Sequence, residues 1–261
     1  MSFFRFFRSK KEDENPNHLI FKDDKGNQIT LSDLEGVSGV FNWQIISNKS
    51  IPSLANQLHQ EARQLGGQGK YELAIQKLME AHSLAPDWPY PIYDLAYTYL
   101  LQKEDENALK YYKLTDLKEP RGFFTAKTAC WSLRKEKEGH FQKGLYRSFI
   151  QIEWLNNKED QLKVARAIVD QFPQYAPAWK IIAAKSDNNN ERLSAIQQGL
   201  NAIPDLETEG MLMINKALVL DLQAQTEDAI TILGNIIFRK ETTAANIEMA
   251  KFVLASIANR K

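Results

Sequence analysis

Residue types that carry chemistry are scarce in this chain. A single cysteine, Cys130, can form no disulfide within the chain, so the sequence does not require an oxidising compartment. The four histidines lie far apart, none belongs to a His-x-x-x-His pair, and together with one cysteine they predict no zinc site. Basic and acidic residues balance at 33 each, which argues against the basic surplus that general nucleic-acid binding needs.

Long hydrophobic runs are also absent. No stretch of about 20 apolar residues predicts a membrane-spanning helix. The start of the chain alternates phenylalanines with arginines and lysines, and it lacks the apolar core and cleavage site of a secretory signal. We therefore expect residues 1–17 to form a disordered aromatic and basic tail with at most weak peripheral contact with a membrane, and we expect a cytoplasmic protein.

Familiar catalytic and ligand-binding motifs are missing as well. Residues 66–69 lack the preceding strand and the Gly-Lys-Ser/Thr ending of a phosphate loop, so they predict a turn between helices. Asp187, Asn189 and Glu191 alternate as in a calcium loop, but Arg192 stands where such a loop needs glycine, so we expect a helix start. No nucleophile, base and orienting group cluster at a recognisable spacing, and we predict no enzyme, no metal and no cofactor.

What the sequence does contain is an internal repeat. Residues 89–120 overlie residues 55–86 at an offset of 34, so that small and apolar residues coincide. A 34-residue period is typical of a unit of two antiparallel helices that must stack on its neighbours to bury its apolar face. The coinciding positions are Leu58 with Ile92, Ala62 with Ala96, Ala74 with Ala108, Leu78 with Tyr112, and Pro86 with Pro120.

The second unit resembles a tetratricopeptide repeat (TPR) at seven signature positions. The small residues Ala96 and Ala108 stand where two helices must cross closely, and Pro120 ends its helix. The resemblance implies an all-α fold, a right-handed superhelical solenoid of antiparallel helix pairs, and a role in protein binding. The seven positions are Ile92, Leu95, Ala96, Tyr99, Ala108, Tyr112 and Pro120.

Later parts of the chain depart from strict repetition. A first helix recurs at Trp179, its shortened unit ends at Pro204, and one further unit precedes an amphipathic helix over about 243–258. We expect this last helix to cap the stack, with Asn246 among the residues that face water. Between Pro120 and Trp179 an even number of helices is required, yet the sequence predicts three, so either one helix is an insertion or the stack changes phase. The three segments are about 122–137, 141–155 and 158–171.

Residues 18–50 have a different character. Short β-like runs at 18–22 and 28–31 flank a hairpin turn, and residues 39–46 favour a third strand. The stretch resembles the opening of thioredoxin-like proteins, but no Cys-x-x-Cys follows Trp43. We therefore predict three parts, namely the tail 1–17, a small β-rich element 18–50 that caps or docks on the first repeat, and a TPR-like helical domain 51–261 with a C-terminal capping helix.

Candidate partner-binding residues follow from the resemblance, because the first helix of each pair lines the concave face in TPR proteins. Tyrosine, tryptophan and arginine dominate binding hot spots, since they bury much area and keep a polar group. Packing between helices is the alternative role for two or three of the aromatics. The candidates are His59, Arg63, Tyr90, Tyr93, Tyr97, Phe124, Lys127, Trp131 and Arg134, with Asn56 and Leu100 beside them.

These residues lead us to expect a non-enzymatic scaffold or adaptor that binds a peptide or helix of a protein partner in the concave groove. Lys127 and Arg134 would attract acidic groups of that partner. The alternative is a regulatory or accessory subunit that acts through the N-terminal element and the irregular middle helix, with its groove occupied by its own segment. A chaperone C-terminal tail is not expected, because His59 and Arg63 stand at the first places of the carboxylate clamp that grips such tails and Asp94 would repel a carboxylate.

Overall fold

The structure is a computed structural model that describes residues 17–22, 42–47 and 50–259. The chain divides into two compact units, residues 1–50 and residues 51–261.

In the first unit, strands β1 (Asn17–Lys22) and β2 (Asn42–Ser47) pair antiparallel. Asn17 lies opposite Ser47, and Lys22 lies opposite Asn42. The expected tail and the expected strand at 28–31 lie outside the described residues. Docking of this element on the first repeat stays a prediction.

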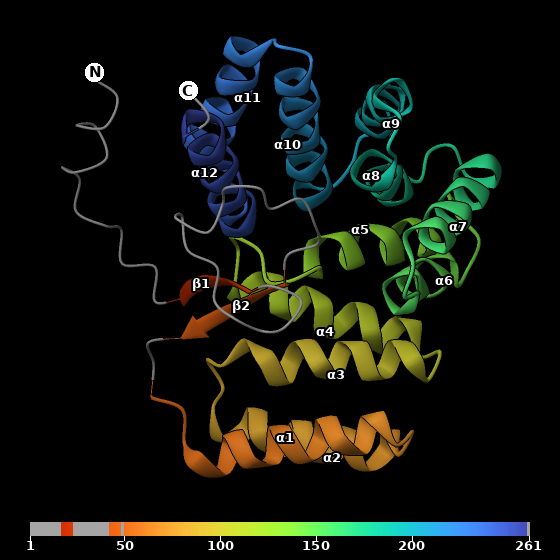
Figure 1. Cartoon of the computed structure of the whole chain (residues 1–261). Coiled ribbons are helices and arrows are strands. Elements are labelled where there is room, and N and C mark those ends of the chain that lie inside the picture. The colour runs from red at the N-terminus through yellow and green to blue at the C-terminus, as the bar shows by residue number, and fades with distance from the viewer. Residues whose placement is uncertain (1–16, 23–41, 48–49, 260–261) are drawn as a thin grey trace. The chain divides into compact units, whose positions relative to one another are not determined.

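The second unit is a TPR-like stack in which helices adjacent in sequence pack against one another (Figure 1). Helices α1 to α4 run across the view of Figure 1, whereas α10 to α12 run up the page on the other side of α5. The elements are α1 (Ser53–Gly67), α2 (Tyr71–Leu84), α3 (Pro89–Leu101), α4 (Asp105–Lys118), α5 (Ala126–Lys137), α6 (Leu145–Ile150), the 3₁₀ helix η3 (Gln151–Trp154), α7 (Lys158–Gln171), α8 (Ala176–Lys185), α9 (Asn189–Asn201), α10 (Leu206–Leu222), α11 (Thr226–Phe238) and α12 (Ala244–Asn259).

Alanines mark the close crossing of the helices in four pairs. Each helix of a pair contributes one alanine. The two alanines belong to the same buried cluster, and each is at most 1% exposed. The second alanine follows the first by 12 positions, and 34 positions separate the sets of α1–α2 and α3–α4, as well as those of α8–α9 and α10–α11. The predicted period is therefore confirmed in α1–α4. It also holds for the alanines of α8–α11, where a shortened unit was expected. The pairs are Ala62 with Ala74, Ala96 with Ala108, Ala183 with Ala195, and Ala217 with Ala229.

The period changes phase between these blocks. Extended forward from Ala96 by 34 positions, it reaches buried Cys130 on α5, but the matching second-helix position is Gln142, which is exposed in a loop. Extended backward from Ala183, it reaches Phe149 on α6 and Gln161 on α7. Helix α5 is thus a first helix without a second in register. Helix α6 with η3 stands at the first-helix position before α7, but α7 packs against α8 and η3 and hardly touches α6 itself. The predicted odd number of helices results from this change of phase.

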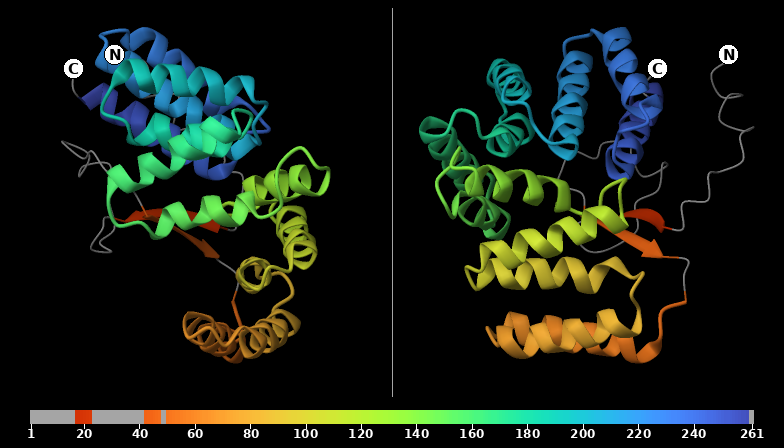
Figure 2. Two further views of the ribbon diagram at one scale, coloured as in Figure 1. Left: turned by 90° about the vertical axis from the view of Figure 1, so that its right-hand side faces the viewer. Right: turned by 180° about the vertical axis from the view of Figure 1, so that it is seen from behind.

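Helix α5 is enclosed because the C-terminal helices return to it. It packs against α4, α6 and α10, and the first turns of α10 and α12 lie beside its start (Figures 1 and 2). The backbone N–H of Ala244 donates to the carbonyl oxygen of Arg121 at 2.8 Å. Gly122, at φ 93°, allows this approach, because a Cβ atom there would lie 3.1 Å from two side-chain carbons of Thr243.

The helix expected over 141–155 is shorter than predicted. It begins at Leu145, and its α-helical part ends at Ile150 before η3. The buried carboxylate of Glu136 accepts hydrogen bonds from the backbone N–H groups of Gly144 at 2.7 Å and Tyr146 at 2.6 Å. These bonds fix the start of α6, and Gly144 takes a left-handed conformation there at φ 87°.

The expectation that Asn246 on α12 faces water was wrong. Its side chain is 2% exposed, and its Nδ2 group donates to the carbonyl oxygens of Leu206 at 3.1 Å and Glu207 at 3.2 Å. Gly210 makes room for it, since a Cβ atom at that position would lie 2.0 Å from Asn246 Nδ2. Helix α12 is therefore tied to the first turn of α10 by polar contacts, and its polar positions do not all serve an outer face.

Candidate functional site

The candidate residues of α1 pair with the next repeat. His59 is 5% exposed, and its Nε2 atom lies 2.8 Å from Asp94 Oδ2. Its ring packs edge-on against Trp88 at a centroid distance of 4.8 Å. Arg63 is exposed, with Nε 3.8 Å from the same Asp94 oxygen. The positions that correspond to a carboxylate clamp are thus bound to one another across α1 and α3.

The aromatic candidates of α3 form one ring cluster with the loop before α5. Tyr90 packs against Phe123 at 5.0 Å and Phe124 at 5.5 Å, and Tyr93 packs against the same two rings. The Tyr93 hydroxyl lies 2.8 Å from Thr125 Oγ1, and burial raises the pKa of Tyr93 well above its ordinary value. Much of the surface of these aromatic side chains is therefore buried in contacts between repeats.

Tyr97 lies against the middle segment. Burial raises the pKa of Tyr97 to about 12, and the side chain of Trp154 on η3 lies close enough to the hydroxyl to oppose this rise in part. Trp154 itself is 56% exposed. In the same segment, Arg147 of α6 binds Asp105 at 2.7 Å, at the start of α4. The irregular segment α6–η3 thus lies along the second repeat and places an exposed tryptophan beside a candidate tyrosine.

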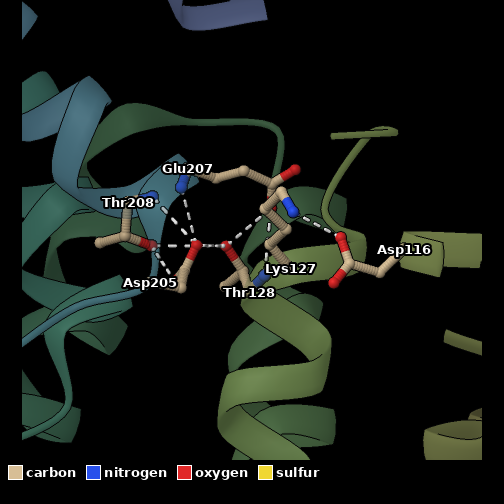
Figure 3. A network of polar contacts seen from close by, with 6 residues as sticks. All are labelled: Asp116, Lys127, Thr128, Asp205, Glu207 and Thr208. Carbon is tan, nitrogen blue, oxygen red and sulfur yellow. Dashed lines mark hydrogen bonds and ion pairs between the residues drawn. The ribbon is translucent and has the colours of Figure 1, made fainter. Parts of the chain in front are cut away.

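Lys127 begins a polar network at the start of α5 (Figure 3). Its Nζ atom lies 2.6 Å from Asp116 Oδ1 of α4, and the ammonium group is largely buried. The next residue, Thr128, turns toward α10: its backbone N–H donates to Glu207 Oε2 at 3.0 Å, and its hydroxyl lies 3.0 Å from Asp205 Oδ1. Lys127 therefore holds α4 against α5, and its charge is already paired.

The α10 side of this network is a helix cap. Asp205 Oδ1 accepts from the backbone N–H groups of Glu207 at 3.0 Å and Thr208 at 3.2 Å, and its other oxygen accepts from the Thr208 hydroxyl at 2.7 Å. Burial, and then the charge of Asp205, raises the pKa of Glu207 to about 8. The network joins residues about 80 positions apart, and sequence reasoning missed it. The only signal was Asp205 directly after Pro204, which is typical of a helix start.

The last two candidates of α5 have different environments. Trp131 is half-buried and packs against Phe141 at 5.6 Å and Tyr175 at 6.0 Å. Arg134 is exposed. Of all nine candidates, Arg63 and Arg134 are the exposed ones, Tyr97 is half-buried beside an exposed tryptophan, and the others pack largely within the fold.

The described residues contain no group of three or more histidine, cysteine, aspartate or glutamate side chains placed to hold a metal ion. Among the described helices, none has the length and the hydropathy needed to cross a membrane. Cys130 is 4% exposed, and burial raises the pKa of its thiol to about 12, so the thiol stays protonated at neutral pH.

The fold defines the class of protein: the helical unit is a TPR-like helical repeat. This assignment rests on the helix pairing and on the recurrence of alanines at intervals of 12 and 34 positions. No protein-family model and no curated protein matches the chain.

Among the solved structures that are similar to this chain, three illustrate the likeness. MamA from residue 41 onward, of Desulfovibrio magneticus RS-1, is 13% identical, with 71% of this chain and 94% of that chain covered and a TM-score of 0.35. TTC0263, a TPR protein of Thermus thermophilus, is 16% identical, with coverage of 77% and 99% and a TM-score of 0.32. The flexible tandem repeat domain of a bacterial cellulose synthase subunit is 18% identical, with coverage of 75% and 98% and a TM-score of 0.45.

Proposed function

We propose that this chain is a non-enzymatic protein–protein interaction scaffold that binds a segment of a partner protein at the surface around Tyr97 and Trp154. Stacked helix pairs suit this role, because they present an extended, preorganised surface without a catalytic constellation. The expected site of action is the cytoplasm, which localisation of a tagged chain tests.

The observation that carries the proposal is the pairing of half-buried Tyr97 with exposed Trp154. A tryptophan that is 56% exposed leaves a large apolar area in water. Its indole lies beside the Tyr97 hydroxyl, which limits its movement, so a partner that covers it would lose little side-chain entropy. Both residues belong to the types that dominate binding hot spots.

The test is recovery of partner proteins on the immobilised full-length chain from cells that naturally contain it. We expect a protein that the wild type retains and that the Tyr97→Ala variant loses at least about tenfold. Phe238→Ala is the matched control, because Phe238 is an aromatic residue that is 81% exposed on α11. Equal recovery by wild type and by Tyr97→Ala would contradict the proposal.

A second candidate function has support from the same pair. If η3 occupies the surface that the partner needs, the protein is a regulatory subunit whose middle segment must move before binding. Trp154→Ala separates the two functions, because it weakens binding if Trp154 contacts the partner and strengthens binding if Trp154 blocks it. Calorimetric titration of the wild type and of Trp154→Ala with the recovered partner shows whether the substitution raises or lowers the affinity.

A further inference from the structure

A groove of about 540 Å³ lies beside α7, away from the residues that the sequence singled out. One wall is the loop before α6 together with the first turn of α6, and the other wall is α7. Leu145 and Phe172 are among the apolar side chains that line it. Its volume falls in the range of ligand clefts, about 300–1,000 Å³.

The groove has a cause in the repeat. Helix α6, which stands in register as the first helix before α7, starts at Leu145, only four positions before Phe149, whereas α3 starts seven positions before Ala96 and α8 seven before Ala183. About one turn of helix is therefore missing at the N-terminal end of α6. The groove opens between this end of α6 and α7, where a full-length first helix would have packed.

The α7 wall has the pattern on which another helix packs. Val164, Ala167, Ile168 and Gln171 line the groove and follow the spacing i, i+3, i+4, i+7, which is one stripe of a helix. Ala167 at its centre is exposed and carries only a methyl group. A second helix can approach such a stripe to the usual 8–10 Å between axes.

The charges at the rim select the partner. Lys143 on one wall and Lys163 on the other are both exposed, and neither forms an ion pair with any described residue. Asp160 also lines the groove, but it lies in the first turn of α7 and is bound to Asn157, so the helix dipole and this contact already stabilise its charge. The rim therefore favours carboxylates.

We propose that this groove binds a helix of a partner protein, with alanine and leucine packed on the α7 stripe and carboxylates opposite Lys143 and Lys163. The site is separate from the Tyr97–Trp154 surface and does not depend on it. The bound helix would supply the turn that α6 lacks.

The probe is a synthetic peptide of about 20 residues, capped at both ends, with leucine and alanine on one helical face and glutamate on both flanks. A matched probe carries lysine in place of every glutamate. Fluorescence polarisation with the full chain at low salt measures both. We expect the glutamate peptide to bind at least about fivefold more tightly than the lysine peptide, because two attractive pairs become repulsive.

Two variants localise the binding. Ala167→Trp fills the groove and is expected to weaken binding of the glutamate peptide at least about tenfold, whereas Leu117→Trp, at an apolar residue that is 76% exposed on α4, leaves it within about twofold. The double variant Lys143→Glu with Lys163→Glu is expected to reverse the preference toward the lysine peptide. A misfolded chain could not produce this reversal, so it separates a charge effect from a loss of structure.

Several results would overturn the proposal. No binding of the glutamate peptide at 1 mM, equal binding of the two peptides, or equal binding by wild type and Ala167→Trp would each do so. Sedimentation of the free chain is the remaining measurement: a wild-type dimer that Ala167→Trp abolishes would assign the groove to a second copy of the chain. If Tyr97→Ala lost peptide binding and Ala167→Trp kept it, the peptide would bind at the Tyr97–Trp154 surface and not in the groove.

Discussion

The regular helix pairs and helix α5 are buried by different means. In α1–α4 and α8–α11 the close contacts are between alanines that recur at fixed intervals, so each repeat specifies its own packing. In α5 the buried residues include three polar ones, Thr128, Ser132 and Glu136, which are at most 4% exposed. Their partners are Glu207 and Asp205 for Thr128, Tyr175 for Ser132, and the backbone of the α6 start for Glu136.

The difference shows what repetition can specify. A repeated pattern fixes contacts between neighbours, because every unit meets the same surface before and after it. At a change of phase the neighbour is no longer the same, and directional hydrogen bonds to residues outside the repeat pattern add to the apolar contacts. We expect four substitutions to separate these two modes of stabilisation.

The largest effect is expected in a regular pair. Ala96→Leu adds a branched side chain where α3 and α4 cross and no space is left, so it should lower the free energy of unfolding by about 3 kcal/mol. Urea unfolding measures this change. Ala167→Leu, at an exposed alanine, should stay within about 0.5 kcal/mol. Similar losses at the two positions would show that close crossing is not what holds the pair.

The next effect concerns α5. Glu136→Ala leaves the N–H groups of Gly144 and Tyr146 without their acceptor in a buried place, so it should cost about 2–3 kcal/mol. The same urea experiment applies. Glu106→Ala removes a glutamate whose side chain is 87% exposed and should change little. A loss at Glu136 no larger than that at Glu106 would contradict a structural role for the buried carboxylate.

A pH-dependent effect follows at the contact of α5 with α10. The pKa of Glu207 in the folded chain is about 8, above its ordinary value of 4.5. The folded chain therefore holds a proton that the unfolded chain releases, and stability falls as pH rises through this window. Thermal unfolding from pH 5 to pH 8 should show this fall in the wild type and a flatter profile in Glu207→Gln. Parallel profiles would mean that Glu207 is ionised in the folded chain at neutral pH.

The smallest effect is at a helix start in the second regular block. The side chain of Asn188 accepts from the backbone N–H groups of Asn190 at 2.9 Å and Glu191 at 3.1 Å. Asn188→Ala should cost about 1 kcal/mol, and Asn190→Ala, which leaves the cap intact, only a few tenths. Thermal unfolding of the two variants side by side measures the difference. Equal midpoints would show that α9 does not depend on its cap.

Most of the helical architecture could be predicted from the sequence. The period of 34 identified the helix pairs, α7 has the predicted bounds, and the odd number of helices between Pro120 and Trp179 pointed to the change of phase. These features depend on apolar spacing and on prolines, which act over a few turns of the chain. The bounds of α6 were not predicted, because Glu136 fixes its start through a contact with the loop.

The site could be predicted less well. Projecting the first-helix positions selected Tyr97, which stays a candidate. The projection could not show that Phe124 and Tyr93 pack on each other or that Lys127 pairs with Asp116. Trp154 was missed because η3 has no counterpart in a regular repeat. The burial of Asn246 and the contact of Thr128 with Glu207 join positions 39 to 79 residues apart, beyond the reach of local patterns.

The enclosure of α5 by α10 has a consequence for the synthesis of the chain. Helices α1 to α4 can pack soon after they leave the ribosome, because their main partners are the helices directly before or after them in the chain. Thr128 has to wait for Glu207, which is added 79 residues later, or roughly 4–16 s at about 5–20 residues per second. During that interval the face of α5 that will contact α10 is exposed to solvent. We expect a chaperone that binds the nascent chain to bind this face.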